Sequence, residues 1–438
     1  MRMVSIGLAA WVLAAAPAHA ETITLTLREA VARALSDGTA VRIAGTHMDS
    51  ASARALEARS ALLPQASLDV TDYNQILNLR TFGLTFPGFP TLVGPFNVFD
   101  AHVTVALKAV DLAAYRRYAA ARQGIAASAR ETEKAENDVA AAVATIYVAL
   151  QRAQASVEAS RANVELFQKL KDLADDQVRA GVATRIDSTR SAVALARQRL
   201  ALLVAENQRD AARLALLHTI GADQSSNVVL ADALEQEGEP APAVEAALSR
   251  AFAERPELRV FTERIKAQEL LAASARAEHY PVLAGQFQGG YNGNQLNALS
   301  WNRVVAGSIS MPLFDGWRAA SRVAEAESQR RELVLARTET ERQVEEEVRG
   351  ALLAYESARS RTRVASENLE LAALELDLAR DRFAGGVAPS IEVDNAQTSL
   401  VTAREDRVAA MADLARARYD LWHATGQIHT LVGGSQTP

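Results

Sequence analysis

Two long segments of the chain carry small or apolar residues at spacings that alternate between four and three. The first seam comprises Val139, Val143, Ile146, Leu150, Ala153, Val157, Ser160, Val164, Phe167, Lys171, Ala174 and Val178. The second lies 205 residues further on and comprises Val344, Val348, Ala351, Tyr355, Ala358, Thr362, Ala365, Leu369, Ala372, Leu376, Ala379 and Phe383. This alternation averages about 3.5 residues per turn and predicts coiled-coil packing along both segments. Polar members of the seams and many alanines indicate shallow packing against neighbours on both sides.

The length of these helical patterns bounds the shape of the molecule. Residues 112–180 and 316–384 are free of proline and rich in strong helix formers. Each can form one helix of roughly 100 Å at about 1.5 Å per residue. A compact domain has no room for such a helix, so the sequence predicts an elongated molecule.

A different pattern, with a period of two, occupies the segments rich in proline and glycine. Apolar and polar residues alternate over 103–108, 283–292 and 305–311. Strands with one apolar and one polar face are typical of membrane β-barrels, and soluble hairpins are the alternative. Aromatic residues gather in or beside these strands, where a membrane interface would lie: Tyr73, Phe82, Phe86, Phe99, Tyr291, Trp301, Phe314 and Trp317. Membrane barrels start at about eight strands, so four strands in the membrane require oligomerisation to remove their edges.

The chain repeats itself. Pro64 matches Pro281 at an offset of 217, whereas Gly181 matches Gly386 at an offset of 205. The first half therefore carries about a dozen extra residues, expected within 81–95. The predicted organisation is a signal peptide (1–20), a first repeat (21–221) with a strand pair at about 65–110 and a turn at 180–184, a linker (222–243), a second repeat (244–426) with a strand pair at about 282–313 and a turn at 385–389, and a C-terminal tail (427–438).

The same turn interrupts the helical pattern of both repeats, as VRAGVATRID at 178–187 and RFAGGVAPSIEVD at 382–394. Glycine ends a helix readily because it adopts the left-handed conformation cheaply. Thr184 and Ser390 are suitable N-caps for the helices that follow, and Asp187 and Glu392 fall in the first helical turn, where acids favour the dipole. A helix hairpin is therefore predicted in each repeat.

The N-terminus and the overall composition indicate export. Arg2, an apolar run over 4–16 and Ala18-His19-Ala20 form a secretory signal peptide. No later stretch is long and apolar enough for a transmembrane helix. The chain has no cysteine, and its formal net charge of -6 gives no basis for nucleic-acid binding.

Catalytic chemistry is not indicated. The seven histidines lie far apart, and His423 and His429, six residues apart, do not share a helical face. Neither a phosphate-binding loop nor a nucleophile elbow is present. We therefore expect neither enzyme activity nor a cofactor or metal.

Four stretches together resemble a known family. They are LTLREAVARAL (25–35), LLPQASLDV (62–70), YPVLAGQFQGGY (280–291) and GSISMPLFDGWRAASRVAEAE (307–327). With the duplicated turn, they are similar to the TolC family of outer-membrane efflux channels over nearly the whole chain. The resemblance implies a mainly α fold with membrane β structure: a homotrimer in which each protomer gives four strands to a twelve-stranded outer-membrane β-barrel, continued by a long periplasmic α-helical barrel.

The resemblance also implies roles for the duplicated turn. The tips that meet a periplasmic adaptor protein would be Ala180, Gly181, Val182, Ala183, Gly385, Gly386, Val387 and Ala388. Candidate residues for the pore constriction are Glu392, Asp394, Asn395 and Asp187, and three copies of an acid around one axis would favour cations. Phe383 and Ala388 stand where the enteric channel has a tyrosine and an arginine that hold its gate, and Arg185 beside Asp187 is a candidate substitute.

The expected function is that of a passive outer-membrane channel of a Gram-negative bacterium, extending into the periplasm. It would work with the adaptor and an inner-membrane efflux pump. A type I protein secretion channel, fed by an ABC transporter, is an alternative within the same class. A periplasmic coiled-coil adaptor is an alternative of a different class, but one hairpin with Gly-rich β domains would not account for two strand pairs.

Overall fold

The computed structural model describes residues 22–234 and 239–431. The predicted signal peptide (1–20) and the last seven residues of the predicted tail lie outside the described residues. Within the described ranges, no helix combines the length and the apolar character needed to cross a bilayer.

The duplicated sequence folds as duplicated structure. The first half contains β1 (Thr22–Leu25), α1 (Leu27–Asp37), α2 (Thr39–Ser60), β2 (Gln65–Asn78), η1 (Leu79–Phe82), β3 (Leu92–Val110), α3 (Leu112–Arg179) and α4 (Arg185–Thr219). The second contains β4 (Asn227–Leu230), α5 (Val244–Glu254), α6 (Pro256–Ala277), β5 (Val282–Gly293), β6 (Ser300–Ser310), α7 (Arg318–Ala384), α8 (Ser390–Ala424) and η2 (Gln427–Leu431). Helices α4 and α8, of 35 residues each, begin 205 residues apart. This correspondence confirms the predicted tandem repeat.

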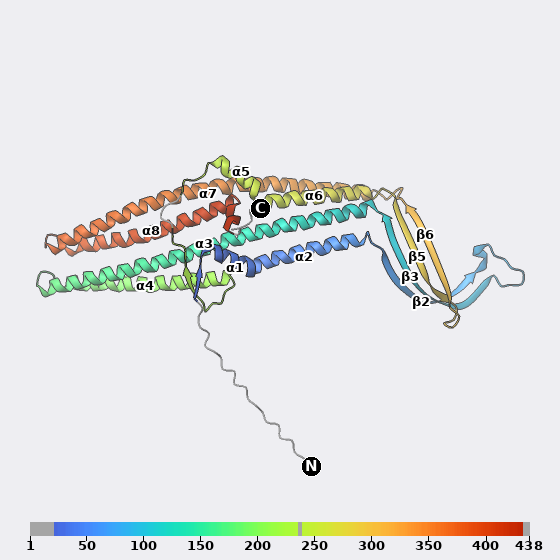
Figure 1. Cartoon of the computed structure of the whole chain (residues 1–438), viewed down its shortest axis with the longest axis horizontal. Coiled ribbons are helices and arrows are strands. Elements are labelled where there is room, and N and C mark those ends of the chain that lie inside the picture. The colour runs from blue at the N-terminus through green and yellow to red at the C-terminus, as the bar shows by residue number, and fades with distance from the viewer. Residues whose placement is uncertain (1–21, 235–238, 432–438) are drawn as a thin grey trace, which may run out of the picture.

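The molecule is elongated, with the sheet of β2, β3, β5 and β6 at one end and two helix-hairpin tips at the other (Figure 1). Helices α3 and α7, with 68 and 67 residues, run from the sheet to the tips, and α4 and α8 return to the middle. The predicted long helices are therefore confirmed.

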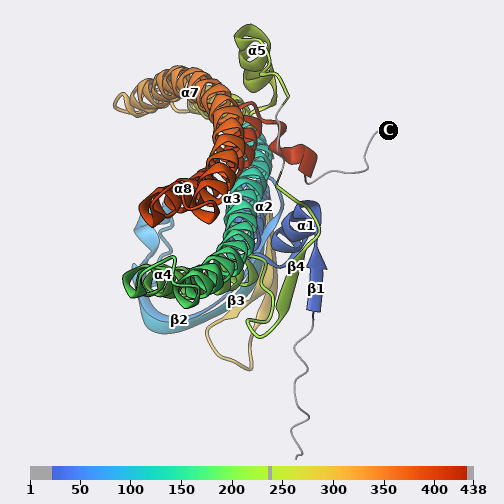
Figure 2. The same ribbon diagram turned by 90° about the vertical axis from the view of Figure 1, so that its left-hand side faces the viewer.

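The helices form a single curved wall. Beside the sheet, α2 contacts α3, α3 contacts α6, and α6 contacts α7; towards the tips, α4 contacts α3, α3 contacts α8, and α8 contacts α7. Viewed from the tip end, the wall is an arc with α4 and α7 at its two ends (Figure 2). The convex side carries α1, β1, β4 and α5.

The predicted seams are buried in this wall. Val143, Leu150 and Val157 are buried in α3, and Val348 and Tyr355 are buried in α7. The polar seam member Thr362 is also buried, and its hydroxyl lies 3.0 Å from the carbonyl oxygens of Ala358 and Ala410. Hydrogen bonding across to α8 explains how a threonine is accommodated in the seam.

A small core at mid-length holds the two repeats together. Strands β1 and β4 pair in parallel, and Leu25, Tyr147, Leu216 and Ile428 are buried with them. The Tyr147 hydroxyl lies 3.0 Å from the Leu25 carbonyl oxygen. Thus β4 lies in the predicted linker, and the first residues of the predicted tail fold as η2 and pack into this core.

The four-stranded sheet is antiparallel in the order β2-β3-β5-β6, and its register separates two faces. One face carries Ala66, Leu68, Val70, Ala101, Val103, Val105, Leu283, Phe287, Tyr291, Trp301, Val305 and Ile309. The other carries Ser67, Asp69, Thr71, Asp100, His102, Thr104, Gln286, Gln288, Asn292, Asn302 and Ser308. One face is therefore largely apolar and the other largely polar.

The two hairpins of the sheet differ in length. Residues 79–91 connect β2 to β3, whereas residues 294–299 connect β5 to β6. The extra residues of the first repeat lie in the β2–β3 hairpin, within the segment expected from the change in offset. That hairpin extends beyond the rest of the sheet (Figure 1).

Candidate functional site: the hairpin tips and the four-stranded sheet

Both helix-hairpin tips end their first helix with the same backbone turn. Gly181 and Gly386 have φ angles of 75° and 72°. The amide of Val182 donates to the Gln177 carbonyl, and the amide of Val387 donates to the Arg382 carbonyl, both at 3.0 Å. The positive φ angle explains the glycine in each turn, because other residues adopt that conformation at a cost.

Each turn presents a valine to the surroundings. The side chains of Val182 and Val387 are 75% and 73% exposed. They occupy equivalent positions in the two tips, at the end of the molecule opposite the sheet (Figure 1). The predicted tip residues therefore form two similar, partly apolar ends.

The two tips are joined through Asp187. The amide and hydroxyl of Thr184, the N-cap of α4, donate to Asp187 Oδ2 at 3.0 and 2.6 Å. Ser390 was expected to be the N-cap of α8, but Pro389 occupies that position. The Ser390 hydroxyl instead donates to Asp187 Oδ1 of the other repeat at 2.8 Å.

This hydrogen bonding determines the electrostatics of Asp187. The donors, first the Thr184 hydroxyl and then the Ser390 hydroxyl, hold the pKa of Asp187 below its usual value. Arg190, 4.0 Å away, is the cation that the described structure places beside Asp187. The sequence had suggested Arg185. It precedes Asp187 by two residues, whereas neighbours on one face of a helix are three or four residues apart, as Asp187 and Arg190 are.

Asp394 lies at the same junction between the hairpins. Burial raises its pKa, the charge of Asp187 adds to this effect, and Arg190 opposes it. Asp187 and Asp394 therefore form a pair of acids with opposite pKa shifts.

The other two constriction candidates have different surroundings. Glu392 forms an ion pair with Arg382 at 2.8 Å, so its charge is compensated within the second tip. Asn395 is exposed and lines a groove of about 760 Å³ between α7 and α8, together with Glu375 and Thr398. Of the four candidates, Asp187 and Asp394 thus interact electrostatically, Glu392 is paired with Arg382, and Asn395 lines the groove.

Phe383, which the resemblance placed where the enteric channel has a tyrosine, packs among apolar side chains. It contacts the buried cluster near the tips that includes Leu376, Val393 and Leu400. A phenylalanine has no hydroxyl with which to form a polar link between tips. The polar link in this chain is made by Ser390 instead.

Six of the eight predicted interface aromatics lie at the two ends of the sheet. Phe314 and Trp317 are 79% and 73% exposed, where β6 leads into α7. Tyr291 and Trp301 form an edge-to-face pair with centroids 5.2 Å apart on the apolar face. Phe82 and Phe86 lie in the β2–β3 hairpin.

The remaining two predicted aromatics lie within the sheet, on opposite faces. Phe99 is on the face that carries Leu68 and Val103, whereas Tyr73 shares the polar face with Asp69 and Thr71. Sequence analysis missed Tyr280, which is 56% exposed and directly precedes Pro281 at the helical end of β5. The sequence feature that could have identified Tyr280 is an aromatic residue just before a predicted strand.

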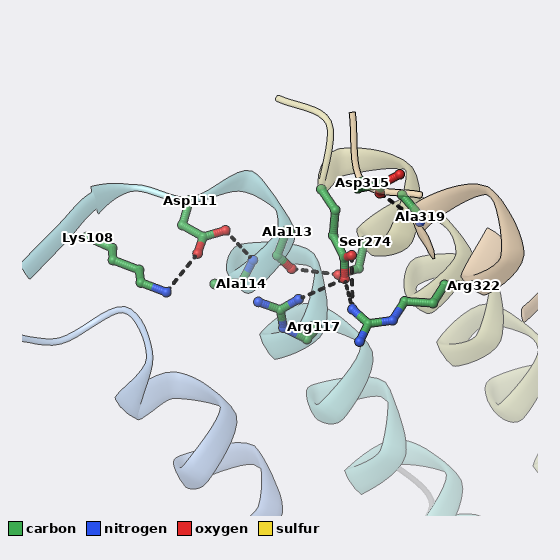
Figure 3. A network of polar contacts seen from close by, with 10 residues as sticks. Lys108, Asp111, Ala113, Ala114, Arg117, Ser274, Asp315, Ala319 and Arg322 are labelled. Atoms are coloured by element: carbon green, nitrogen blue, oxygen red, sulfur yellow. Dashed lines mark hydrogen bonds and ion pairs between the residues drawn. The ribbon is translucent and has the colours of Figure 1, made fainter. Parts of the chain in front are cut away.

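A network of polar contacts lies where the sheet leads into the helices (Figure 3). Asp111 caps α3 by accepting from the Ala114 amide at 2.8 Å, and Asp315 accepts from the Ala319 amide at 2.9 Å in the first turn of α7. Glu278 binds Arg322 at 2.7 Å and lies 3.8 Å from Arg117. Glu278 therefore connects the ends of α3 and α7, a role that sequence analysis did not identify.

No metal centre emerges from the described part of the chain, where no group of three or more His, Cys, Asp or Glu residues could hold an ion. His423 contacts Asp138 at 3.2 Å, and His429 contacts the Gly426 carbonyl at 2.7 Å. Both contacts are structural links near the ends of helices.

A curved helical wall attached to a sheet with one apolar and one polar face defines a channel-forming protein of the outer membrane. The chain belongs to the outer membrane efflux protein family, whose model matches residues 30–222 and 247–427. The resemblance to TolC-like channels is thereby confirmed. Members of the family are channels of the outer membrane and not enzymes, and these statements hold for this chain.

Several solved structures share the fold of this chain over most of its length. A membrane protein from Pseudomonas aeruginosa is 21% identical, with a TM-score of 0.77 over 91% of this chain and 93% of that chain. The outer membrane protein VceC of Vibrio cholerae is 19% identical, with a TM-score of 0.77 over 91% and 96%. The outer membrane channel CmeC of Campylobacter jejuni is 18% identical, with a TM-score of 0.75 over 92% and 85%. No curated protein sequence matches the chain significantly.

Proposed function

We propose that this chain is the outer-membrane component of a tripartite efflux system. It conducts substrates passively from an inner-membrane pump and a periplasmic adaptor to the cell exterior. The observation that carries the proposal is the combination, in one protomer, of a curved helical wall, a two-faced sheet and two exposed hairpin tips. A purely structural rod would need neither the sheet nor the curvature.

The sheet supplies part of a membrane barrel. Its apolar face, with Leu68, Val103 and Phe287, contacts lipid, and its polar face, with Asp69 and Gln288, lines the aqueous lumen. This division follows the alternation that membrane β-barrels require. In the described sheet, β2 and β6 each have only one neighbour. Pairing of β6 with β2 of the next protomer closes the barrel.

The ends of the helical arc support a homotrimer. Exposed apolar side chains follow the α4 end at Val193, Leu200, Leu203, Val204 and Leu214. Others follow the α7 end at Val334, Leu335, Leu353, Leu371 and Leu378. Because α4 and α7 lie at opposite ends of the arc (Figure 2), the two apolar edges meet when copies are placed side by side. Three protomers with four strands each give twelve strands.

The tips dock the adaptor. Val182 and Val387 give the trimer six exposed valines at its periplasmic mouth, and exposed apolar surface of this kind marks an interaction site. The acids near the tips lie where the lumen narrows. There Asp187 and Asp394 favour cations, whereas Glu392 is partly neutralised by Arg382.

The tips provide the test. We expect Val387→Arg, alone or with Val182→Arg, to reduce dye efflux and adaptor cross-linking by about tenfold or more, because an unpaired charge is costly in an interface. The matched control is Leu296→Arg, a 72% exposed apolar residue in the β5–β6 loop at the opposite end. The tip variants and the control variant should all form trimers on native gels. Normal efflux and adaptor cross-linking in the double variant would show that the tips do not dock an adaptor.

A further inference from the structure

The β2–β3 hairpin carries exposed apolar side chains that have no role in the wall of the channel. No residue between 81 and 99 is charged. Phe82, Phe86 and Phe89 are 65%, 54% and 70% exposed, and Leu84 is 45% exposed. Exposed apolar surface of this kind marks an interaction site.

The hairpin is locally ordered. Asn78 caps η1 by accepting from the Arg80 amide at 3.1 Å, and Gly83 ends it with a φ angle of 70°. The rings of Phe86 and Phe89 meet edge to face, with centroids 6.4 Å apart. The phenylalanines are therefore presented by a defined turn and not by an irregular strand extension.

A specific distortion redirects this hairpin. The register of β2 and β3 shifts between Gln75 and Leu77. The extra residue is on β3, where Gly94 and Pro95 lie opposite Ile76. A Cβ atom on Gly94 would come within 2.8 Å of the Gln75 carbonyl oxygen. Bulges bend and twist a strand pair. The glycine allows the close approach of the backbones at the bend.

The bend carries the hairpin towards the concave side of the helical arc. In Figure 1, the strands beyond the bulge leave the direction of the sheet. In the view from the tip end, the light-blue end of this hairpin appears behind α8, on the concave side of the helical arc (Figure 2). The shorter β5–β6 hairpin does not extend to that side.

We propose that the three β2–β3 hairpins of the trimer pack against one another over the threefold axis and form an apolar constriction at the outer mouth. The inference rests on the homotrimer of the proposed function. The occupant of each exposed hairpin is the same hairpin of the neighbouring copies. The uncharged stretch 81–99 can meet its copies in this way without like-charge repulsion, and the one charged residue of the 79–91 connection is Arg80, in η1.

The composition and direction of the hairpin favour this occupant over lipid. Segments that bind a bacterial lipid surface carry lysine or arginine for the phosphates, and interface positions prefer tryptophan and tyrosine. The stretch 81–99 has none of these four residue types, and Arg80 is the one such residue in the 79–91 connection. It also bends to the lumen side, away from the surrounding membrane.

An apolar constriction changes how the channel closes. A narrow ring of phenylalanines dewets and resists ions even without polar contacts. The tips at the other end carry acids. Exported molecules therefore pass a charged constriction first and an apolar constriction last.

Cysteine cross-linking tests the constriction directly, because the chain contains no cysteine of its own. In Phe89→Cys trimers in outer membranes, mild oxidation should give disulfide-linked dimers, since one bond uses two of the three thiols. The control is Leu296→Cys, with a similarly exposed side chain in the β5–β6 loop, which should remain monomeric on denaturing gels.

Conductance gives a second readout. In planar bilayers, the Phe82→Ser, Phe86→Ser, Phe89→Ser triple variant should conduct at least about twofold more than the wild type if the rings obstruct the mouth.

The outcomes separate the two proposals. Intact trimers on native gels without Phe89→Cys dimers would overturn the constriction alone, as would cross-linking of Phe89→Cys to a thiol-reactive lipid probe in place of a second copy. A chain that remains monomeric in the membrane would overturn the homotrimer, and the constriction with it.

Discussion

The hydroxyl of Ser390 donates a 2.8 Å hydrogen bond to the carboxylate of Asp187, and this contact joins the hairpin tips of the two repeats. The residues are 203 positions apart and belong to α8 and α4. Because Thr184 donates to the other carboxylate oxygen, Asp187 is held from both sides. The tips can separate only if this arrangement is broken.

Removal of the link should loosen the tips. In Ser390→Ala, loss of a hydrogen bond to a charged group costs about 1 kcal/mol at this part-buried site, which corresponds to an approximately fivefold shift towards separated tips. Single-channel recording should show a higher open probability. The control Thr398→Ala removes a hydroxyl that bonds only within α8, to the Asp394 carbonyl, and should leave gating unchanged. Equal behaviour of the two variants would contradict the role of the link.

The pKa of Asp187 predicts how the link responds to acid. Since the folded-state pKa is lowered, the stabilisation is fully present above the ordinary aspartate value, near about 3.9, and is lost as the pH falls through the lowered value. Conductance of the wild type should therefore stay constant from neutral pH to about pH 5 and rise only in stronger acid. Asp187→Asn should conduct more at neutral pH and lack this rise. A wild-type transition near neutral pH would contradict the assignment.

Asp394 should have the opposite effect on stability. Burial raises its pKa, so the charged form is a cost to the folded state above that pKa and is relieved as the pH falls. Asp394→Asn should raise the melting temperature of the trimer at neutral pH by about 1 to 2 °C, and the gain should disappear in acid. Asp377→Asn, with a side chain that is 73% exposed, is the control and should change little. A lower melting temperature for Asp394→Asn would show that its charge is stabilising.

One glycine of the sheet should be indispensable. A Cβ atom on Gly290 would lie 2.2 Å from the Ala101 carbonyl oxygen and 2.4 Å from His102 Cα, so Gly290→Ala must displace β3. Overpacking of this kind costs about 1–3 kcal/mol. Heat resistance of the trimer on denaturing gels should fall in this variant. Gly307→Ala on the neighbouring strand, where no atom lies within 4 Å of the added Cβ, should behave as the wild type.

Much of the fold was readable because it depends on local pattern. The 4-3 seams located α3 and α7, the period of two located the strands, and the two offsets identified the repeat. Glycine at 181 and 386 marked both tips, since a left-handed turn requires it in each. The candidate acids were recognised as residue types, but their partners were not. Ser390 was interpreted as a cap because its position before α8 suits one, and the proline beside it took that role.

The sequence by itself determined the lengths of the helices, the positions of the turns and the alternating faces of the sheet, because each follows from residues close together in the chain. Only the tertiary structure decided which helix lies beside which, and hence that Asp187 meets Ser390 while Glu392 meets Arg382. The physical reason is the similarity of the alanine-rich helices, which would allow several lateral orders. The direction of the β2–β3 hairpin was likewise decided in three dimensions, by the bulge that contains Gly94.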